Sequence, residues 1–310
     1  MYRFIINPNS RSGEGSKIWN RVKAVLDARS VSYEYAMTEY PGHACELAAD
    51  FTREASDGNQ ICLVVLGGDG TIHEAMSGIC DPENVIFGFI PAGSGNDFCR
   101  SMGLPNDPMD ALELILTFGR PKKTDIPVIH YGREKSRFGI SCGIGYDAAV
   151  CHEVLTSPLK KAFNRIKLGK LVYLIIALRQ MVFTAPCKAR LTMDGGREVK
   201  LNRMYFAAVM NQPYEGGGFR FCPDARPDDG LLDVIAVDSI SKLRMLAILP
   251  TAFFGRHTHF RGIHIYKCRS IEIRCSHPFA VHIDGESGGV RRSISVSLED
   301  VKLPIITDSK

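Results

Sequence analysis

Residues 1 to about 120 alternate short apolar runs with longer stretches of mixed polar and apolar residues. Continuous apolar runs of strand length are typical of strands buried on both faces of a parallel sheet. We expect strands at residues 2–6, 32–37, 61–66 and 85–90, and helices at 16–28, 42–53 and 109–117, with another helix starting at residue 71. This alternation predicts a parallel sheet that is covered by helices on both faces.

After residue 121 the pattern changes to closely spaced segments of β type. We expect strands at residues 122–131, 136–142, 188–193, 203–211, 232–237, 262–266, 270–275, 278–283 and 293–298. Many short strands with turn residues between them favour an antiparallel sandwich or barrel. The expected fold class is therefore α/β plus all-β, with a parallel-sheet domain at residues 1–121 and a β-rich domain at residues 122–299.

The run Gly-Gly-Asp-Gly-Thr at residues 67–71 lies between an expected strand and an expected helix. Backbone N–H groups converge on an anion at such a turn, and glycines let a phosphate approach the backbone. The carboxylate of Asp69 would repel phosphate, so it suits a group that holds Mg²⁺ or orients a hydroxyl. The loop indicates ATP binding and phosphoryl transfer, and the alternative is an ordinary glycine-rich turn.

Two other strand ends carry similar loops. Residues 91–98 read Pro-Ala-Gly-Ser-Gly-Asn-Asp-Phe, in which Ser94 offers a hydroxyl to phosphate or ribose and Asn96 and Asp97 can cap a helix. Residues 7–13 read Asn-Pro-Asn-Ser-Arg-Ser-Gly after the first strand. The carboxyl ends of parallel strands share one edge of a sheet, where open α/β folds bind ligands.

Taken together, these loops resemble the catalytic domain of the diacylglycerol kinase and sphingosine kinase superfamily, and most of all the soluble bacterial lipid kinases. The second half agrees, with Gly-Ile-Gly-Tyr-Asp at 143–147, Gly-Gly-Gly at 216–218, Asp-Asp-Gly-Leu-Leu-Asp at 228–233 and Asp-Gly-Glu at 284–286. The resemblance implies that the chain tail, residues 300–310, returns to the first domain, and that the active site lies in the interdomain cleft. It implies ATP-binding residues at Asn7, Pro8, Asn9, Ser10, Arg11, Thr38, Gly67, Gly68, Asp69, Gly70, Thr71, Ile72, His73 and Ser94.

The resemblance also places a catalytic acid pair at Asp284 and Glu286, with Asp69 beside them. A lipid hydroxyl needs a carboxylate that accepts its proton as the bond to phosphorus forms. We favour Asp284 as this base, and Glu286 is the alternative or else a Mg²⁺ ligand beside Asp69. From the residues alone, Asp-Gly after a strand favours a hairpin turn, and the resemblance is what favours the catalytic role.

A structural Mg²⁺ site is implied near residues 226–233. The carboxylate of Asp229 and the backbone carbonyls of Arg226 and Leu231 would supply oxygen ligands, with water completing the shell. The alternative is a polar turn that enters a strand.

Composition agrees with a cytoplasmic enzyme that touches a membrane surface peripherally. The 310 residues carry a net charge of +4 and 45% hydrophobic residues, which is mildly basic and far from a nucleic-acid-binding profile. We expect no secretory start and no membrane-spanning run. Ten cysteines without a C-x-x-C pair, among them Cys62, Cys142 and Cys275 in strand-like runs, indicate reduced core thiols and no zinc site.

Two segments suit a membrane contact. Residues 157–186 combine five Lys or Arg residues at positions 160–170 with a short apolar helix, and Phe253-Phe254-Gly255-Arg256 is a smaller candidate. The alternative for residues 157–186 is a buried helix with a solvated basic end. A homodimer is left open by the sequence.

The leading interpretation is an ATP- and Mg²⁺-dependent lipid kinase that converts diacylglycerol to phosphatidic acid. His73 followed by Glu74 resembles sphingosine kinases, so a sphingoid base or another long-chain alcohol is the first alternative. A soluble-substrate kinase like NAD kinase shares the Gly-Gly-Asp-Gly loop and is the second. A non-catalytic module that senses nucleotide or lipid is the third.

Overall fold

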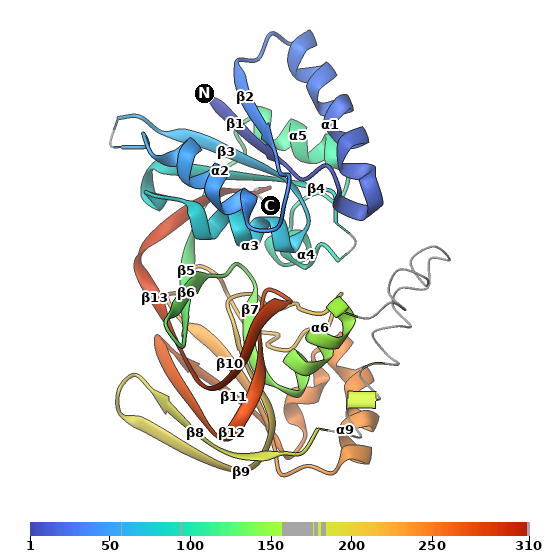
Figure 1. The fold of residues 1–310 in the computed structure, drawn as a ribbon, viewed down its shortest axis with the longest axis vertical. Helices are drawn as coiled ribbons and strands as arrows, with labels where there is room; N and C mark the ends of the chain where they lie inside the picture. The colour runs from blue at the N-terminus through green and yellow to red at the C-terminus, as the bar shows by residue number, and fades with distance from the viewer. Residues whose placement is uncertain (57, 94, 157–175, 177–178, 181–183, 309–310) are drawn as a thin grey trace.

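The computed structural model describes residues 1–308 except residues 57, 94, 157–175, 177–178 and 181–183. The chain forms two lobes, one above the other in Figure 1, and the chain crosses between them at β5 and β13. The segment 157–186, expected to face a membrane, lies mostly outside the described residues. Among the described residues, no helix is both long and apolar enough to cross a bilayer.

The N-terminal lobe is an open parallel sheet with strand order β4-β3-β1-β2. Its elements are β1 (Tyr2–Ile6), α1 (Ser10–Ala28), β2 (Tyr33–Met37), α2 (His43–Thr52), β3 (Ile61–Gly67), α3 (Asp69–Gly78), η1 (Pro82–Asn84), β4 (Val85–Pro91), α4 (Asp97–Met102) and α5 (Pro108–Leu116). Every residue of β3 is buried because separate apolar clusters cover the two faces of the sheet. The expected doubly covered parallel sheet is confirmed.

The C-terminal lobe is built almost entirely from antiparallel strands. Its elements are β5 (Pro121–Tyr131), β6 (Glu134–Arg137), β7 (Ser141–Gly145), α6 (Tyr146–Thr156), β8 (Cys187–Met193), β9 (Arg197–Met210), β10 (Leu232–Asp238), α9 (Lys242–Ile248), η2 (Leu249–Phe254), η3 (Arg256–His259), β11 (Ile263–Cys268), β12 (Ser270–Ile283) and β13 (Glu286–Ile306). Strand β8 pairs with both β9 and β12, so the strands enclose a common apolar core. The expected β-rich class is confirmed.

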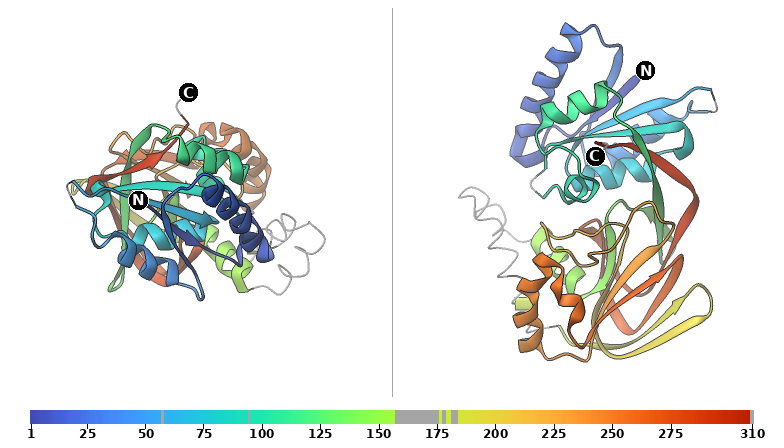
Figure 2. Two further views of the ribbon diagram at one scale, coloured as in Figure 1. Left: turned by 90° about the horizontal axis from the view of Figure 1, so that it is seen from above. Right: turned by 180° about the vertical axis from the view of Figure 1, so that it is seen from behind.

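Strand β13 belongs to both lobes. Its first half pairs with β12, its second half pairs with β5, and Ile305 lies opposite Phe87 of β4. Leu303 and Ile305 are buried in the apolar cluster of the N-terminal lobe. Figure 2 shows the same strand running from one lobe to the other in the view from behind. The domain limits proposed from sequence, 1–121 with 300–310 and 122–299, stay a prediction.

Some element limits differ from those expected. Helix α1 begins at Ser10, so most of the loop expected at residues 7–13 is helical. The strand expected at 136–142 is divided into β6 and β7, because the N–H groups of residues 139–141 turn away to a side chain at residue 284. Conversely, the strands expected at 270–275 and 278–283 form the single strand β12.

Candidate active site

The loops after β1, β3 and β4 are bonded to one another at the carboxyl edge of the parallel sheet. The side-chain amide of Asn7 donates to Thr71 Oγ1 at 3.1 Å, and the Asn7 N–H donates to the Leu66 carbonyl at 2.9 Å. The Ala92 N–H donates to the Gly67 carbonyl at 2.7 Å. These bonds bring the loops after β1, β3 and β4 together, as expected for loops at the carboxyl ends of parallel strands.

Glycine is required where two of these loops meet. A Cβ atom on Gly93 would lie 2.8 Å from Gly68 Cα, and a Cβ on Gly67 would lie 2.5 Å from Thr71 Oγ1. A side chain at Gly93 would push the β3 and β4 loops apart, and one at Gly67 would displace Thr71 within the β3 loop. Without side chains, these positions also let a phosphate approach the backbone.

Asp69 connects the β3 loop to the start of α4. Its Oδ1 accepts from the Phe98 N–H at 3.3 Å and its Oδ2 accepts from the Asp97 N–H at 3.4 Å. Burial, followed by the negative charge of Asp97, raises the pKa of Asp69 to about 6. A carboxylate whose ionised form is destabilised in this way fits a divalent cation, because the added positive charge would stabilise that form.

Asp284 forms the turn between β12 and β13. It has φ 49° and is followed by Gly285 at φ 85°, the left-handed pair that a tight hairpin turn needs. Its Oδ1 accepts from the N–H groups of Ile140 at 2.8 Å and Ser141 at 2.9 Å, and its Oδ2 accepts from Gly139 at 2.8 Å. The side chain, 1% exposed, is thereby held in one orientation.

The hairpin turn meets the N-terminal lobe at α3. His73 Nδ1 lies 3.4 Å from Asp284 Oδ2. Burial alone would lower the pKa of His73, but the hydrogen bond and charge of Asp284 outweigh burial and raise it. Glu286 is exposed, and a Cβ on Gly70 would lie 2.9 Å from its Oε1. Asp69, Asp284 and Glu286, which are far apart in sequence, therefore meet at the interface of the two lobes.

The other expected ATP-binding residues lie around the same edge, and they differ in whether the backbone or the side chain can face a nucleotide. Asn9 and Ser10 donate backbone N–H groups to Asn7 at 3.0 and 3.3 Å. Thr38 follows β2, and its N–H donates to the Ile6 carbonyl. Ile72 is buried in the core, so only its backbone can face a nucleotide. The remaining residues on this edge are Pro8, which accepts from Ser16, and Arg11, which is exposed. Ser94 lies outside the described residues.

The proposed metal residues Arg226, Asp229 and Leu231 lie in the loop before β10, which contacts β5 through a bond from the Gly230 N–H to Asp125 Oδ2 at 2.8 Å. Asp229 Oδ1 accepts from the Leu231 N–H at 3.1 Å, and Lys267 Nζ lies 3.6 Å from Asp229 Oδ2. The neighbouring Asp233 is buried, and burial raises its pKa although Lys267 Nζ lies 3.3 Å from its Oδ2. Two carboxylates that share one lysine, Asp229 and Asp233, offer hard oxygen ligands of the kind that suit Mg²⁺.

Sequence reasoning missed a buried group behind the catalytic turn. His282 Nε2 lies 3.1 Å from Asp147 Oδ2 and 3.1 Å from Glu215 Oε1. Burial, reduced by the charge of His282, raises the pKa of Glu215 to about 7. Burial would lower the pKa of His282, but Glu215 and Asp147 raise it to about 9. The only local signal was that His282 lies two residues before Asp284 on a buried strand.

A second missed contact joins the lobes through Asp97. The Gly217 N–H donates to Asp97 Oδ2 at 2.6 Å, and Arg100 pairs with the other oxygen. Gly217 lies in the same loop as Glu215. The loop 214–219 therefore connects the buried His282 group to the helix that Asp69 caps.

Comparisons with known proteins agree with this geometry. Residues 1–128 match the family described as the diacylglycerol kinase catalytic domain. Residues 141–301 match the family described as the YegS C-terminal NAD kinase beta sandwich-like domain.

Two named proteins illustrate the sequence similarity. "Putative lipid kinase YtlR" of Bacillus subtilis (strain 168) is 31% identical over 295 residues, which cover 92% of this chain and 93% of that protein. "Diacylglycerol kinase" of Mycobacterium tuberculosis (strain ATCC 25618 / H37Rv) is 28% identical over 284 residues, covering 91% of this chain and 87% of that protein.

Solved structures share the fold over the whole chain. "A putative diacylglycerol kinase from Bacillus anthracis str. Sterne" superposes with a TM-score of 0.77 at 23% identity, covering 99% of this chain and 97% of that chain. An NAD kinase from Archaeoglobus fulgidus in complex with ATP gives a TM-score of 0.54 at 14% identity, covering 100% and 95%. At these identities the likeness concerns the fold.

Proposed function

The chain belongs to the diacylglycerol kinase family of ATP-dependent lipid kinases, and from this premise we propose that it transfers the γ-phosphate of ATP to diacylglycerol, giving phosphatidic acid. The observation that carries the proposal is the meeting of Asp284 and Glu286 with the Gly67–Gly70 loop at the lobe interface. The names of the relatives from Bacillus subtilis and Mycobacterium tuberculosis support a lipid acceptor.

The β1, β3 and β4 loops would receive the nucleotide. Their uncovered backbone N–H groups and the N-terminus of α3 favour the phosphate charge, while Asn7 holds the first two loops in register. Asp69, braced against α4, is the residue that would hold Mg²⁺. When bound, the metal would offset the negative charge of the triphosphate.

Asp284 would act as the base. Three backbone N–H groups fix its carboxylate, and Oδ2, which accepts one of them and lies 3.4 Å from His73 Nδ1, is the oxygen on the side of the N-terminal lobe. That oxygen would take the hydroxyl proton as the oxygen–phosphorus bond forms and ADP leaves. Glu286, which is exposed beside Gly70, is the alternative base.

The lipid is the finer part of the proposal. His73 lies against Asp284 and therefore close to the acceptor hydroxyl, so its presence keeps a sphingoid base as the second candidate acceptor. We also propose that Asp229, with the carbonyls of Arg226 and Leu231, holds a structural Mg²⁺ that orders the loop before β10. Lys267 supplies part of the positive charge there already.

The test is transfer of labelled γ-phosphate from ATP·Mg²⁺ to a panel of lipids in mixed micelles, with NAD and fructose 6-phosphate alongside. We expect label on diacylglycerol, with kcat lowered about 10²- to 10⁴-fold in Asp284→Asn because the proton acceptor is lost. Glu272→Gln, a carboxylate change elsewhere on β12, is the matched control and should leave kcat unchanged.

Other outcomes would change the conclusion in defined ways. A larger loss in Glu286→Gln than in Asp284→Asn would move the base to Glu286. Label only on a sphingoid base would keep the mechanism and change the substrate. Label only on NAD or the sugar phosphate would contradict lipid phosphorylation, and no transfer to any acceptor would favour a sensing module.

A further inference from the structure

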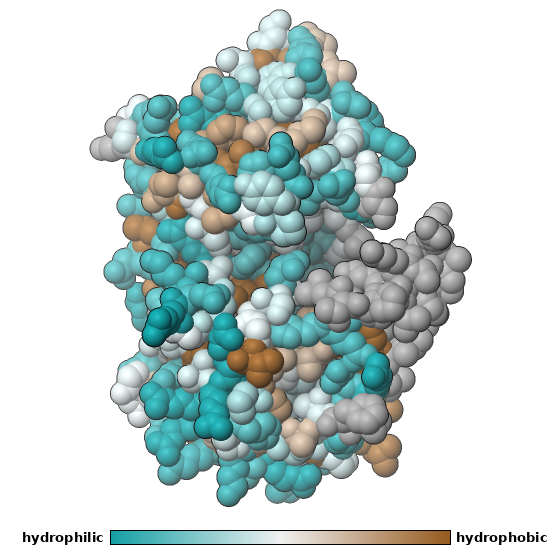
Figure 3. Space-filling model, in the orientation of Figure 1, coloured by the Kyte–Doolittle hydropathy of each residue, from teal (hydrophilic) through white to brown (hydrophobic). Residues whose placement is uncertain are grey.

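The helical segment formed by α9 and η2 exposes apolar side chains where a surface helix normally carries polar ones. On the face drawn in Figure 3 the described surface is mostly hydrophilic and apolar residues occur in small patches. On α9 and η2, by contrast, Leu243, Ala247, Pro250 and Phe253 are all exposed and follow one another at intervals of three or four residues. That spacing places them along one side of a helix. Leu243 is 82% exposed and the adjacent Phe254 is 72% exposed.

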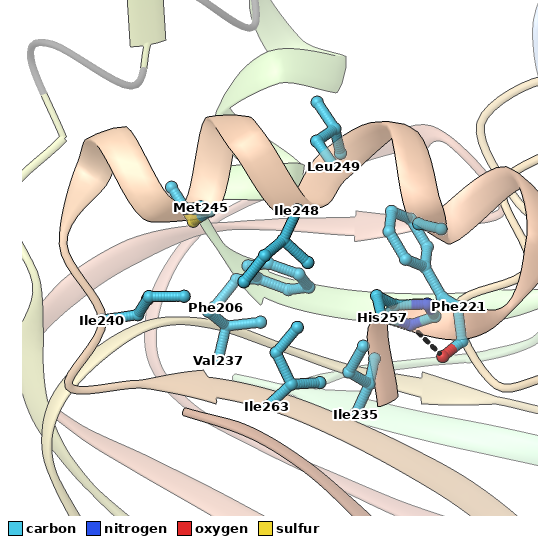
Figure 4. Close-up of a pocket in the computed structure, with 11 residues that line it drawn as sticks. Phe206, Phe221, Ile235, Val237, Ile240, Met245, Ile248, Leu249, His257 and Ile263 are labelled. Atoms are coloured by element: carbon cyan, nitrogen blue, oxygen red, sulfur yellow. Dashed lines mark hydrogen bonds between the residues drawn. The ribbon is translucent and has the colours of Figure 1, made fainter. Parts of the chain in front are cut away.

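The opposite side of the same segment already forms the core contact. Met245 and Ile248 point toward Phe206 and Val237, as Figure 4 shows, and Ala252 continues the buried side. The cavity between them is about 40 Å³, room for about three water molecules and too small for an acyl chain. The packing of the lobe therefore uses the inner face and leaves the outer apolar face without a role.

The segment is also basic. Residues 239–271 contain no Asp or Glu and six Lys or Arg residues. Arg244, Arg256 and Arg261 are exposed, and in the described part of the chain they form no ion pair. An apolar helix face bordered by arginines is complementary to a bilayer that carries anionic headgroups.

The segment is connected to the candidate active site through the loop 214–219. Phe253 stacks on Phe219 with ring centroids 4.0 Å apart, and the Arg220 N–H donates to the Ala252 carbonyl at 2.9 Å. Within that loop, Gly217 reaches Asp97 of the N-terminal lobe. A partner on the outer face of α9 and η2 would therefore lie against the element that reaches the lobe interface.

We propose that the outer face of α9 and η2, formed by Leu243, Arg244, Ala247, Pro250, Phe253 and Phe254, docks together with Arg256 at the start of η3 on the surface of an anionic phospholipid bilayer. The proposal rests on the proposed function, in that a lipid kinase takes its acceptor from a membrane. The apolar side chains would enter the headgroup boundary, and the arginines would pair with phosphates.

The test is cosedimentation of the full chain with phosphatidylcholine vesicles made with and without phosphatidylglycerol. We expect binding that requires phosphatidylglycerol and weakens with salt. Leu243→Ser/Phe254→Ser should weaken it about tenfold or more, because two side chains lose their burial in the bilayer. Arg244→Gln/Arg256→Gln should weaken it and reduce its salt dependence. Phe118→Ser/Val290→Ser removes two exposed apolar side chains elsewhere and is the matched control.

Both substitution sets are on exposed positions, so folding is checked by the thermal unfolding midpoint. Unchanged vesicle binding in Leu243→Ser/Phe254→Ser, or equal binding to both vesicle types, would overturn the proposal. So would a wild-type dimer that dissociates in this variant, because a second copy would then cover the face. Kinase activity on lipid dispersed in detergent micelles is measured in parallel. If wild type and every variant lack kinase activity while vesicle binding is as expected, the proposed function is contradicted and the docking surface is still supported.

Discussion

Asp284 unites two interpretations that the sequence presents as alternatives. It forms a tight hairpin turn, as Asp-Gly after a strand suggests, and the same turn brings its carboxylate to His73 of the other lobe. His282, two residues earlier, has no comparable local signal. Its partners Asp147 and Glu215 come from other elements, so only the folded chain shows that it is a buried counter-charge.

His282 makes the stability of the protein depend on pH. Its folded pKa of about 9 lies above its unfolded value near 6.5, so its contribution is complete below about pH 6.5 and is lost as the pH rises through 9. Glu215, with a folded pKa of about 7, acts in the same direction between about pH 4.5 and 7.

We therefore expect His282→Asn to lower the free energy of unfolding at pH 7 by about 3–5 kcal/mol, because two buried carboxylates lose their partner. Urea unfolding between pH 6.5 and 9 measures the effect. Wild type should lose stability across this range and the variant should lose much less. The exposed His130→Asn is the control. Parallel pH curves for wild type and variant would show that His282 is not the titrating group.

At the scale of elements, the sequence predicts what local pattern determines. The β1, β3 and β4 strands and the loops that follow them were predicted because apolar runs and glycine-rich turns are local features. Helix α1 begins six residues earlier than expected, since Asn-Pro-Asn-Ser resembles a loop in sequence, whereas in the structure Ser10 N–H donates to the Asn7 carbonyl and Ser16 N–H to the Pro8 carbonyl. The division between β6 and β7 was missed because a side chain more than 140 residues away causes it.

The contact between the β3 and β4 loops gives an element-scale prediction. Gly93→Ala places a Cβ 2.8 Å from Gly68 Cα, so the two loops must separate. We expect KM for ATP to rise about tenfold or more while the thermal unfolding midpoint changes little, because the strain is confined to the loop tips. Gly196→Ala, where a Cβ meets nothing within 4 Å, is the control. An unchanged KM for ATP would mean that the packing of these loops does not shape the nucleotide site.

For the whole molecule, the residue pattern predicts the class of each lobe, whereas the way the lobes are joined was implied by the family resemblance alone. Continuous hydrogen bonding from β12 through β13 to β4 makes one sheet of both lobes. Alternation of apolar residues in the tail is too short to show which lobe it completes, and only the pairing of Ile305 with Phe87 shows this.

Ile305→Ala tests this connection. The side chain is fully buried in the N-terminal apolar cluster, so we expect the free energy of unfolding to fall by about 2–5 kcal/mol. Denaturant unfolding followed by Trp19, which is buried in the same lobe, reports the loss. Val290→Ala, on the exposed part of the same strand, should have little effect. Equal destabilisation by both changes would assign the effect to β13 alone and not to the N-terminal core.

The two-lobe course of β13 also sets an order on the synthesis of the protein. Leu303 and Ile305 fill the core of the first lobe, yet a ribosome adds Leu303 only after residues 1–302 have been joined. The parallel sheet emerges early with part of its core missing and stays incomplete while the whole second lobe is translated. We therefore expect the nascent N-terminal lobe to expose part of its apolar core until β13 has been synthesised and can pair with β4.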